Sequence, residues 1–66
     1  MSAGVVAAFD ADRGTGTIHG DDGRDYFFHC IAIAGGVRTI DEGTEVVFDV
    51  VPGHQGRWEA ARIRSS

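Results

Sequence analysis

The 66-residue chain has no lysine, one cysteine, one proline and no long apolar run. A single cysteine excludes an internal disulfide, and Cys30 shares with the three histidines no spacing that zinc sites usually have. No segment approaches the ~18 apolar residues of a membrane span. Residues 1–4 also lack the basic start of a secretory signal. We therefore expect a cytoplasmic protein with no metal, no cofactor and no membrane association.

Positive charge is also scarce in this chain. Six arginines stand against ten acidic residues, which gives a formal net charge of -4. Each phosphate contact requires a nearby Lys or Arg, so the acidic balance argues against tight, charge-driven binding to nucleic acid or to an anionic membrane. A weak contact led by stacking remains compatible with the composition.

The residues that are present are typical of one small globular domain, residues 1–66. Hydrophobic residues make up 42% of the chain and charged residues 24%. A core of this size rarely supplies more than ~3–5 kcal/mol, and it leaves room only for shallow pockets. We expect the chain to fold alone, as a monomer.

Turn residues divide the chain into apolar runs of strand length. The runs are Val5–Phe9, Thr15–His19, Asp25–Cys30, Glu45–Val51 and Trp58–Ile63. The segments between them carry the Gly, Asp or Pro that turns require. The sequence predicts an all-β fold, a small five-stranded antiparallel closed barrel, because closure removes edges that short sheets cannot cover. An open meander is the alternative, and residues 31–34 are expected to form one helical turn as a connector.

Two segments carry most of the functional information: Arg13-Gly14-Thr15-Gly16-Thr17-Ile18 on the second predicted strand and Asp25-Tyr26-Phe27-Phe28-His29-Cys30 on the third. A period of two places Phe27 and His29 on one face of the third strand, with Tyr26 and Phe28 on the other. Aromatic rings on a β surface offer π faces on which unpaired bases stack, at about 1–3 kcal/mol each, while cations hold the backbone. Any base can stack, so little sequence preference is expected.

These segments, together with their surroundings, resemble the cold-shock domain, a five-stranded barrel of the OB type. The resemblance covers nearly the whole chain, and it includes Gly4-Val5-Val6, Phe9-Asp10, Asp21-Asp22-Gly23, Ala32-Ile33 and Glu42-Gly43. In that family the second and third strands read roughly K-G-F-G-F-I and D-V-F-V-H-F, the paired RNP motifs. The resemblance implies a protein that is not an enzyme and binds single-stranded RNA or DNA, as a chaperone or a regulator of transcription or translation in bacteria. It also implies that Phe27 and His29 face outward and that Arg13 replaces the motif's lysine.

The chain departs from the family at several binding positions. Ala7 and Ala8 stand where the family usually has a Lys and a Trp. Thr15, Thr17 and Cys30 stand where it has aromatic residues. At about 1 kcal/mol for each of the missing aromatics, the loss amounts to roughly 4 kcal/mol, or nearly three decades of affinity. Weak binding of low sequence specificity is therefore expected, although the threonine hydroxyls still offer hydrogen bonds.

Trp58, the single tryptophan, follows Arg57 on the last predicted strand and offers some compensation. If Ala61 and Ile63 face inward, then Trp58 faces outward with Ala60 and Arg62. Whether Trp58 lies beside Phe27 or on the far side of the barrel stays open. The candidate nucleic-acid-binding residues are Phe9, Arg13, Thr15, Thr17, Phe27, His29, Arg38, Arg57 and Trp58.

Each of these features also has a simpler explanation. Phe9, Phe27 and Trp58 are large enough to serve as core residues. Cys30 beside His29 is not expected to be catalytic, because neighbours on a strand point to opposite faces. The aspartates between residues 10 and 25 are expected to be turn residues. The alternative function is a barrel that has lost most nucleic-acid binding and acts as a protein-interaction module with a protein partner.

Overall fold

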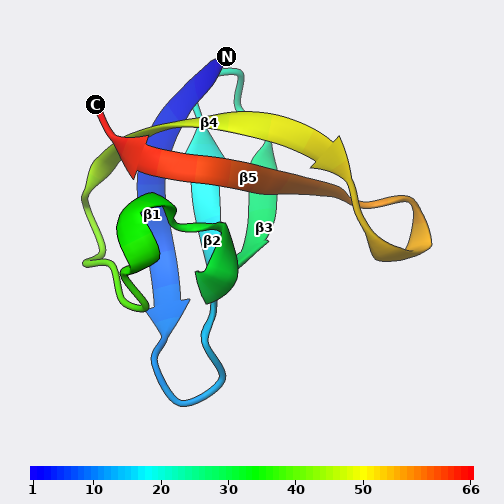
Figure 1. Cartoon of the computed structure of the whole chain (residues 1–66). Helices are drawn as coiled ribbons and strands as arrows, with labels where there is room; N and C mark the ends of the chain where they lie inside the picture. Colours follow the sequence, from blue (N-terminus) through cyan, green and yellow to red (C-terminus); the bar gives the residue numbers. More distant parts are fainter.

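Five strands close into a barrel in the order β1-β2-β3-β5-β4 (Figure 1). The computed structural model describes residues 1–66. Its strands are β1 Ser2–Asp10, β2 Thr15–Gly20, β3 Asp25–His29, β4 Glu45–Pro52 and β5 Trp58–Ser65. Each predicted apolar run falls on one of these strands, with only Cys30 beyond a strand end. The all-β five-stranded closed barrel is thus confirmed.

Strand pairing is antiparallel everywhere except at the seam between β3 and β5. There the two strands run parallel and share a single residue pair, Phe27 with Glu59. An isolated parallel bridge between Ile33 and Ile63 extends this contact. In Figure 1, β4 and β5 cross over the other three strands, and the hairpin that joins them projects past β3. The sheet is therefore mixed, and its closing seam is short.

The connection from β3 to β4 contains two short 3-10 turns, η1 Cys30–Ala32 and η2 Ala34–Gly36. The single helical turn expected at residues 31–34 is thus present as a pair of tighter turns (Figure 1). Ile33 separates them, and within η2 Gly35 has a φ of 84°, a left-handed conformation that favours glycine. The connector brings Ile33 into the core and then leads into the loop before β4.

The core lies inside the barrel and has ten buried residues: Val6, Ile18, Tyr26, Phe28, Cys30, Ile33, Val46, Phe48, Ala60 and Ile63. On β3 the alternation is as predicted, because Tyr26 and Phe28 are buried while Phe27 and His29 are exposed. Phe9 is half-buried, and its ring stacks on that of Phe28 with centroids 6.0 Å apart. Phe9 therefore belongs partly to the core and partly to the surface.

Irregularities in β1 and β5 change which residues face inward. In β1 the register against β2 shifts between Val6 and Ala8, so Ala7 and Ala8 are both exposed. In β5 the shift coincides with Arg62, whose φ is 50°. Because of that shift Ala60 is buried together with Ile63, and the prediction that Ala60 faces outward was wrong.

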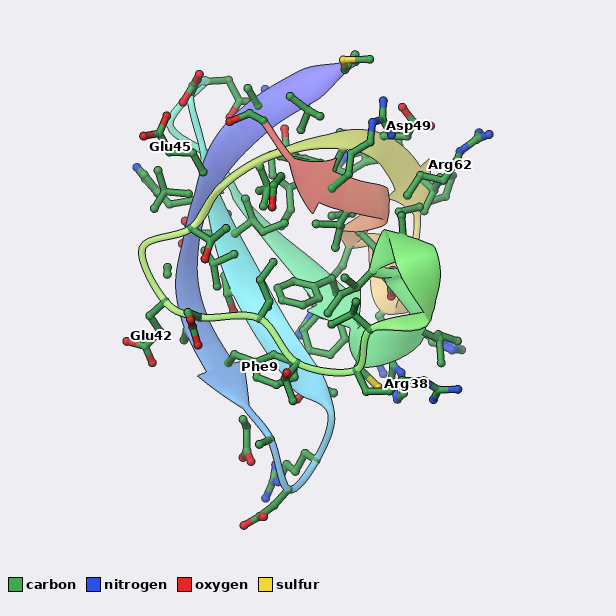
Figure 2. The ribbon with its side chains drawn as sticks, turned by 60° about the vertical axis from the view of Figure 1, so that its left-hand side comes forward. Phe9, Arg38, Glu42, Glu45, Asp49 and Arg62 are labelled. Atoms are coloured by element: carbon green, nitrogen blue, oxygen red, sulfur yellow. The ribbon has the colours of Figure 1, made fainter.

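The irregularity in β5 also places Arg62 beside β4. Its Nε lies 2.7 Å from Asp49 Oδ2, and the two side chains point toward each other in Figure 2. Exposed ion pairs contribute little stability, but this one fixes the direction of the Arg62 side chain. Arg62 is thereby held on the β4 side of the barrel.

Candidate nucleic-acid interface

The outer surface of β1, β2 and β3 forms one continuous face, which we call the open face. Thr17 of β2 pairs with Ala8 of β1 and with Phe27 of β3, so these residues form a row across the three strands. A second row, closer to the β1–β2 turn, runs from Asp10 through Thr15 to His29. Paired residues on a sheet project to the same side, so both rows face the solvent together. Phe27 is 38% exposed on β3, at one side of this face.

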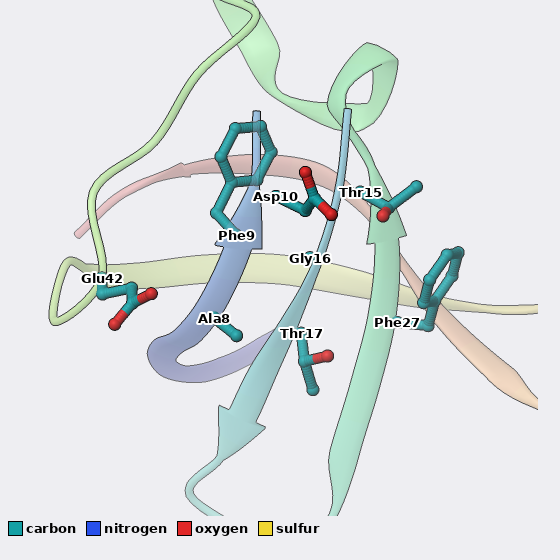
Figure 3. Close-up of a pocket in the computed structure, with 8 residues that line it drawn as sticks. All are labelled: Ala8, Phe9, Asp10, Thr15, Gly16, Thr17, Phe27 and Glu42. Atoms are coloured by element: carbon teal, nitrogen blue, oxygen red, sulfur yellow. The ribbon is translucent and has the colours of Figure 1, made fainter. Parts of the chain in front are cut away.

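One side of the open face is hollowed into a depression of about 250 Å³, which we call the acidic depression (Figure 3). Phe9 and Phe27 stand at opposite sides of it, and Thr17 lies between them. Its charged groups are the carboxylates of Asp10 and Glu42, and no arginine lines it. The Cβ of any residue replacing Gly16 would lie 2.5 Å from Phe28 Cζ, so this position requires glycine.

A second depression of about 350 Å³ adjoins the first, and we call it the Trp58 depression. It shares Thr17 and Phe27 with the acidic depression, and it is otherwise lined by Arg24, Asp25, Tyr26, Gly56, Arg57 and Trp58. Trp58 is 51% exposed. The question that the sequence left open is answered, because Trp58 lies beside Phe27. The β4–β5 hairpin, which projects past β3, carries it there.

Among the predicted cations only Arg57 lines a depression. Arg13 lies in the β1–β2 turn with its side chain 82% exposed, and its Nε is 3.9 Å from Asp10 Oδ2. Arg38 lies beside the 3-10 turns, in the connector to β4 (Figure 2), and lines neither depression. Arg24, which the sequence did not single out, lines the Trp58 depression. Strand alternation gave no signal for it, because Arg24 belongs to the turn before β3.

Hydrogen bonds to Asp22 hold the turn that carries Arg24. The Tyr26 hydroxyl donates to Asp22 Oδ2 at 2.5 Å, and the backbone N–H of Arg24 donates to Oδ1 at 2.9 Å. The Tyr26 bond, followed by the Arg24 bond, lowers the pKa of Asp22. The same contact raises the pKa of Tyr26, because it favours the protonated phenol. Asp22 is thus a turn residue, as predicted, that also orients the edge of the Trp58 depression.

His29 is exposed and faces the same side as Phe27, but it lines neither depression. Its Nδ1 lies 3.8 Å from Sγ of the buried Cys30. Asp10, another predicted turn residue, accepts the backbone N–H groups of Asp12 and Arg13 at 3.0 and 3.2 Å. No group of His, Cys, Asp and Glu has the arrangement of a metal site. No helix is long and apolar enough to cross a membrane.

A closed barrel of five short strands, with aromatic and arginine side chains gathered over β3 and its neighbours, defines the class of OB-type barrels. Residues 2–66 match the family model of the 'Cold-shock' DNA-binding domain, and the chain belongs to this family. The members of the family are non-enzymatic nucleic-acid-binding proteins. The resemblance seen in the sequence is thereby confirmed over nearly the whole chain.

Several relatives are similar to the chain over most of their length. Cold shock protein 2 of Lactiplantibacillus plantarum is 46% identical over 57 residues, which cover 85% of this chain and 86% of the relative. The cold shock-like protein CspD of Bacillus cereus is 42% identical with the same coverage. Among solved structures, drosophila Unr CSD456 superimposes with a TM-score of 0.81 at 27% identity, covering 98% of this chain and 26% of that one.

Proposed function

We propose that this cold-shock domain protein binds unpaired RNA or DNA weakly and with little sequence preference, by stacking bases on the open face. The observation that carries the proposal is the exposed ring of Phe27, which borders both depressions. Trp58 adds a second exposed ring beside it, Phe9 lies across the acidic depression, and His29 follows two residues later on β3. A π face accepts any base, which accounts for the low specificity.

The weakness of binding follows from what surrounds Phe27. Ala8, Thr15 and Thr17 lie at neighbouring positions on the face and offer no ring. The two arginines that line a depression, Arg24 and Arg57, must hold the phosphates of a strand against a net charge of -4. The threonine hydroxyls and Arg13 supply further polar contacts at the margin. The proposed biological role is that of a nucleic-acid chaperone or a regulator of transcription or translation in a bacterial cytoplasm, acting as a monomer without a cofactor.

The experiment is a titration of the ¹⁵N-labelled protein with dT6 and U6, followed through backbone amide shifts at low and at near-physiological salt. We expect saturable shifts around Phe27 with micromolar or weaker affinity, which decreases as salt rises. Phe27→Ala should weaken binding by about 1–3 kcal/mol. The matched control is Val37→Ala, because Val37 is 49% exposed, lies in the connector between β3 and β4, and lines neither depression.

Amides that do not move at millimolar oligonucleotide would contradict the proposal. That result would favour the protein-interaction module, for which an oligonucleotide is no ligand. Equal affinities for Phe27→Ala and wild type would instead show that binding exists but does not use Phe27.

A further inference from the structure

Resting on the proposed function, we propose that an unpaired strand binds in the Trp58 depression alone. There one base stacks against Phe27 and Trp58, and phosphates lie near Arg24 and Arg57. The site then spans about two to three nucleotides, fewer than the ~4–16 that OB folds usually occupy. The acidic depression, although it belongs to the same face, receives no part of the strand.

The aromatic rings are available on one side of the face only. Trp58 and Phe27 are 51% and 38% exposed, and they line one depression of about 350 Å³. The ring pairs of the structure, Phe9 with Phe28 and Tyr26 with Phe48, include neither of them. No other aromatic ring therefore stacks on either of them, and both keep exposed surface for a base. Phe9, the one ring that borders only the acidic depression, already lies against Phe28 with an angle of 11° between the ring planes.

Charge divides the face in the same way. Arg24 and Arg57 line the Trp58 depression, and neither takes part in an ion pair. The one carboxylate there, that of Asp25, lies 2.8 Å from His19 Nδ1. The acidic depression presents Asp10 and Glu42 with no lining arginine. Like charges placed close together repel, so a phosphate over this depression is disfavoured.

The row between the two depressions does not offer a path for a longer strand. From Phe27 the row continues to Thr17 and then to Ala8, neither of which has a ring for the next base. A strand that left the Trp58 depression in this direction would gain no stacking and would approach two carboxylates. Ordering further nucleotides would cost conformational entropy, and no additional stacking would offset that cost.

The test measures affinity as a function of strand length, with dT2, dT3, dT4, dT6 and dT8 titrated into the full chain at constant salt. We expect the affinity to rise up to about dT3 and then, from dT3 to dT8, by no more than about sixfold, because a strand of eight only offers about six equivalent registers of three nucleotides. Amide shifts should be confined to residues 24–27 and 56–59. Amide shifts report on the site without relying on the fluorescence of Trp58.

Substitutions of Trp58 test whether its ring takes part in binding. Trp58→Ala should weaken dT3 binding about tenfold, whereas Trp58→Phe, which keeps a ring, should stay within about threefold of wild type. Val37→Ala removes a side chain of similar exposure, 49%, in the connector and should change nothing. Equal binding by Trp58→Ala and wild type would overturn the inference.

Two further outcomes separate this inference from the function on which it rests. Affinity that rises tenfold or more between dT3 and dT6, with amide shifts at Ala8 and Thr15, would overturn the short site and leave the nucleic-acid-binding function intact. No binding of any strand at millimolar concentration would overturn both.

Discussion

The acidic depression and the Trp58 depression lie side by side on one barrel face and share Thr17 and Phe27, yet their chemistry is opposite. Besides the shared Phe27 ring, the first presents two carboxylates and a ring that already packs on the core, whereas the second presents two arginines outside any ion pair, the Trp58 ring and a single carboxylate. Both are built from outward-facing side chains. Residues at such positions can change without disturbing the barrel, so a binding surface can shrink or move while the fold persists.

The largest effect is expected from removing the buried ring beneath the acidic depression. Phe28 is fully buried, and it packs under Phe9 and Gly16. Phe28→Ala should cost about 3–5 kcal/mol, which equals most of the ~3–5 kcal/mol that a domain of this size has. We expect the variant to be largely unfolded at 25 °C in urea-free buffer by circular dichroism. Ile31→Ala, at a site that is 71% exposed, serves as the control and should unfold like wild type.

Converting the acidic depression into a stacking surface should raise the affinity for long strands more than for short ones. Ala8 is exposed at the end of the row that starts at Phe27. Ala8→Trp should raise the affinity for dT6 by about tenfold, since each added stacking partner contributes about 1–3 kcal/mol. The affinity for dT2 should change much less, because a dinucleotide fills the Trp58 depression only. A gain that is equal for the two lengths would contradict the division of the face.

Removing the cations of the Trp58 depression should change the response to salt. With Arg24 and Arg57 each neutralising one phosphate, the log–log slope of affinity against salt is about -1.4 for a single strand. The double variant Arg24→Ala, Arg57→Ala should show a slope near zero in the same titration. Arg64→Ala is the control, because Arg64 lines neither depression and its Nη1 donates to the Arg62 carbonyl. A control slope as flat as that of the double variant would mean that charge acts through the whole protein.

The smallest expected effect concerns the turn at the edge of the Trp58 depression. The folded pKa of Asp22 is below its ordinary value of 3.8, so its stabilisation is present above about pH 4 and lost as the pH falls further. The folded pKa of Tyr26 is above 10.0, so the stabilisation is present below pH 10 and lost as the pH rises. Asp22→Asn should flatten the acid side of a plot of urea midpoint against pH. An unchanged acid limb would show that this contact does not contribute to stability.

The strands and the alternation on β3 could be predicted from the sequence because both depend on local patterns. Turn residues mark the strand ends, and period two assigns Phe27 and His29 to the outside. Ala60 was assigned wrongly because the register shift in β5 reverses the alternation. A register shift of this kind is set by pairing with β4, and no residue type in the sequence predicts it.

The candidate site was predictable only where it depends on single strands. Phe27, Thr17 and Phe9 were found from the motif positions, and all three line a depression. The neighbourhood of Trp58 depends on how the β4–β5 hairpin meets β3, through a seam of one residue pair. Sequence patterns do not encode such a long-range contact. Arg24 was missed for a related reason, since a turn and not a strand sets its direction.

Intermolecular nuclear Overhauser effects in the complex with dT3 would show directly which of the two depressions holds the strand. We predict contacts from the thymine H6 and methyl protons to the ring protons of both Trp58 and Phe27, with none to the methyl groups of Ala8 and Thr15. Contacts to Ala8 and Thr15 without any to Trp58 would contradict the account. They would place the strand over the acidic depression.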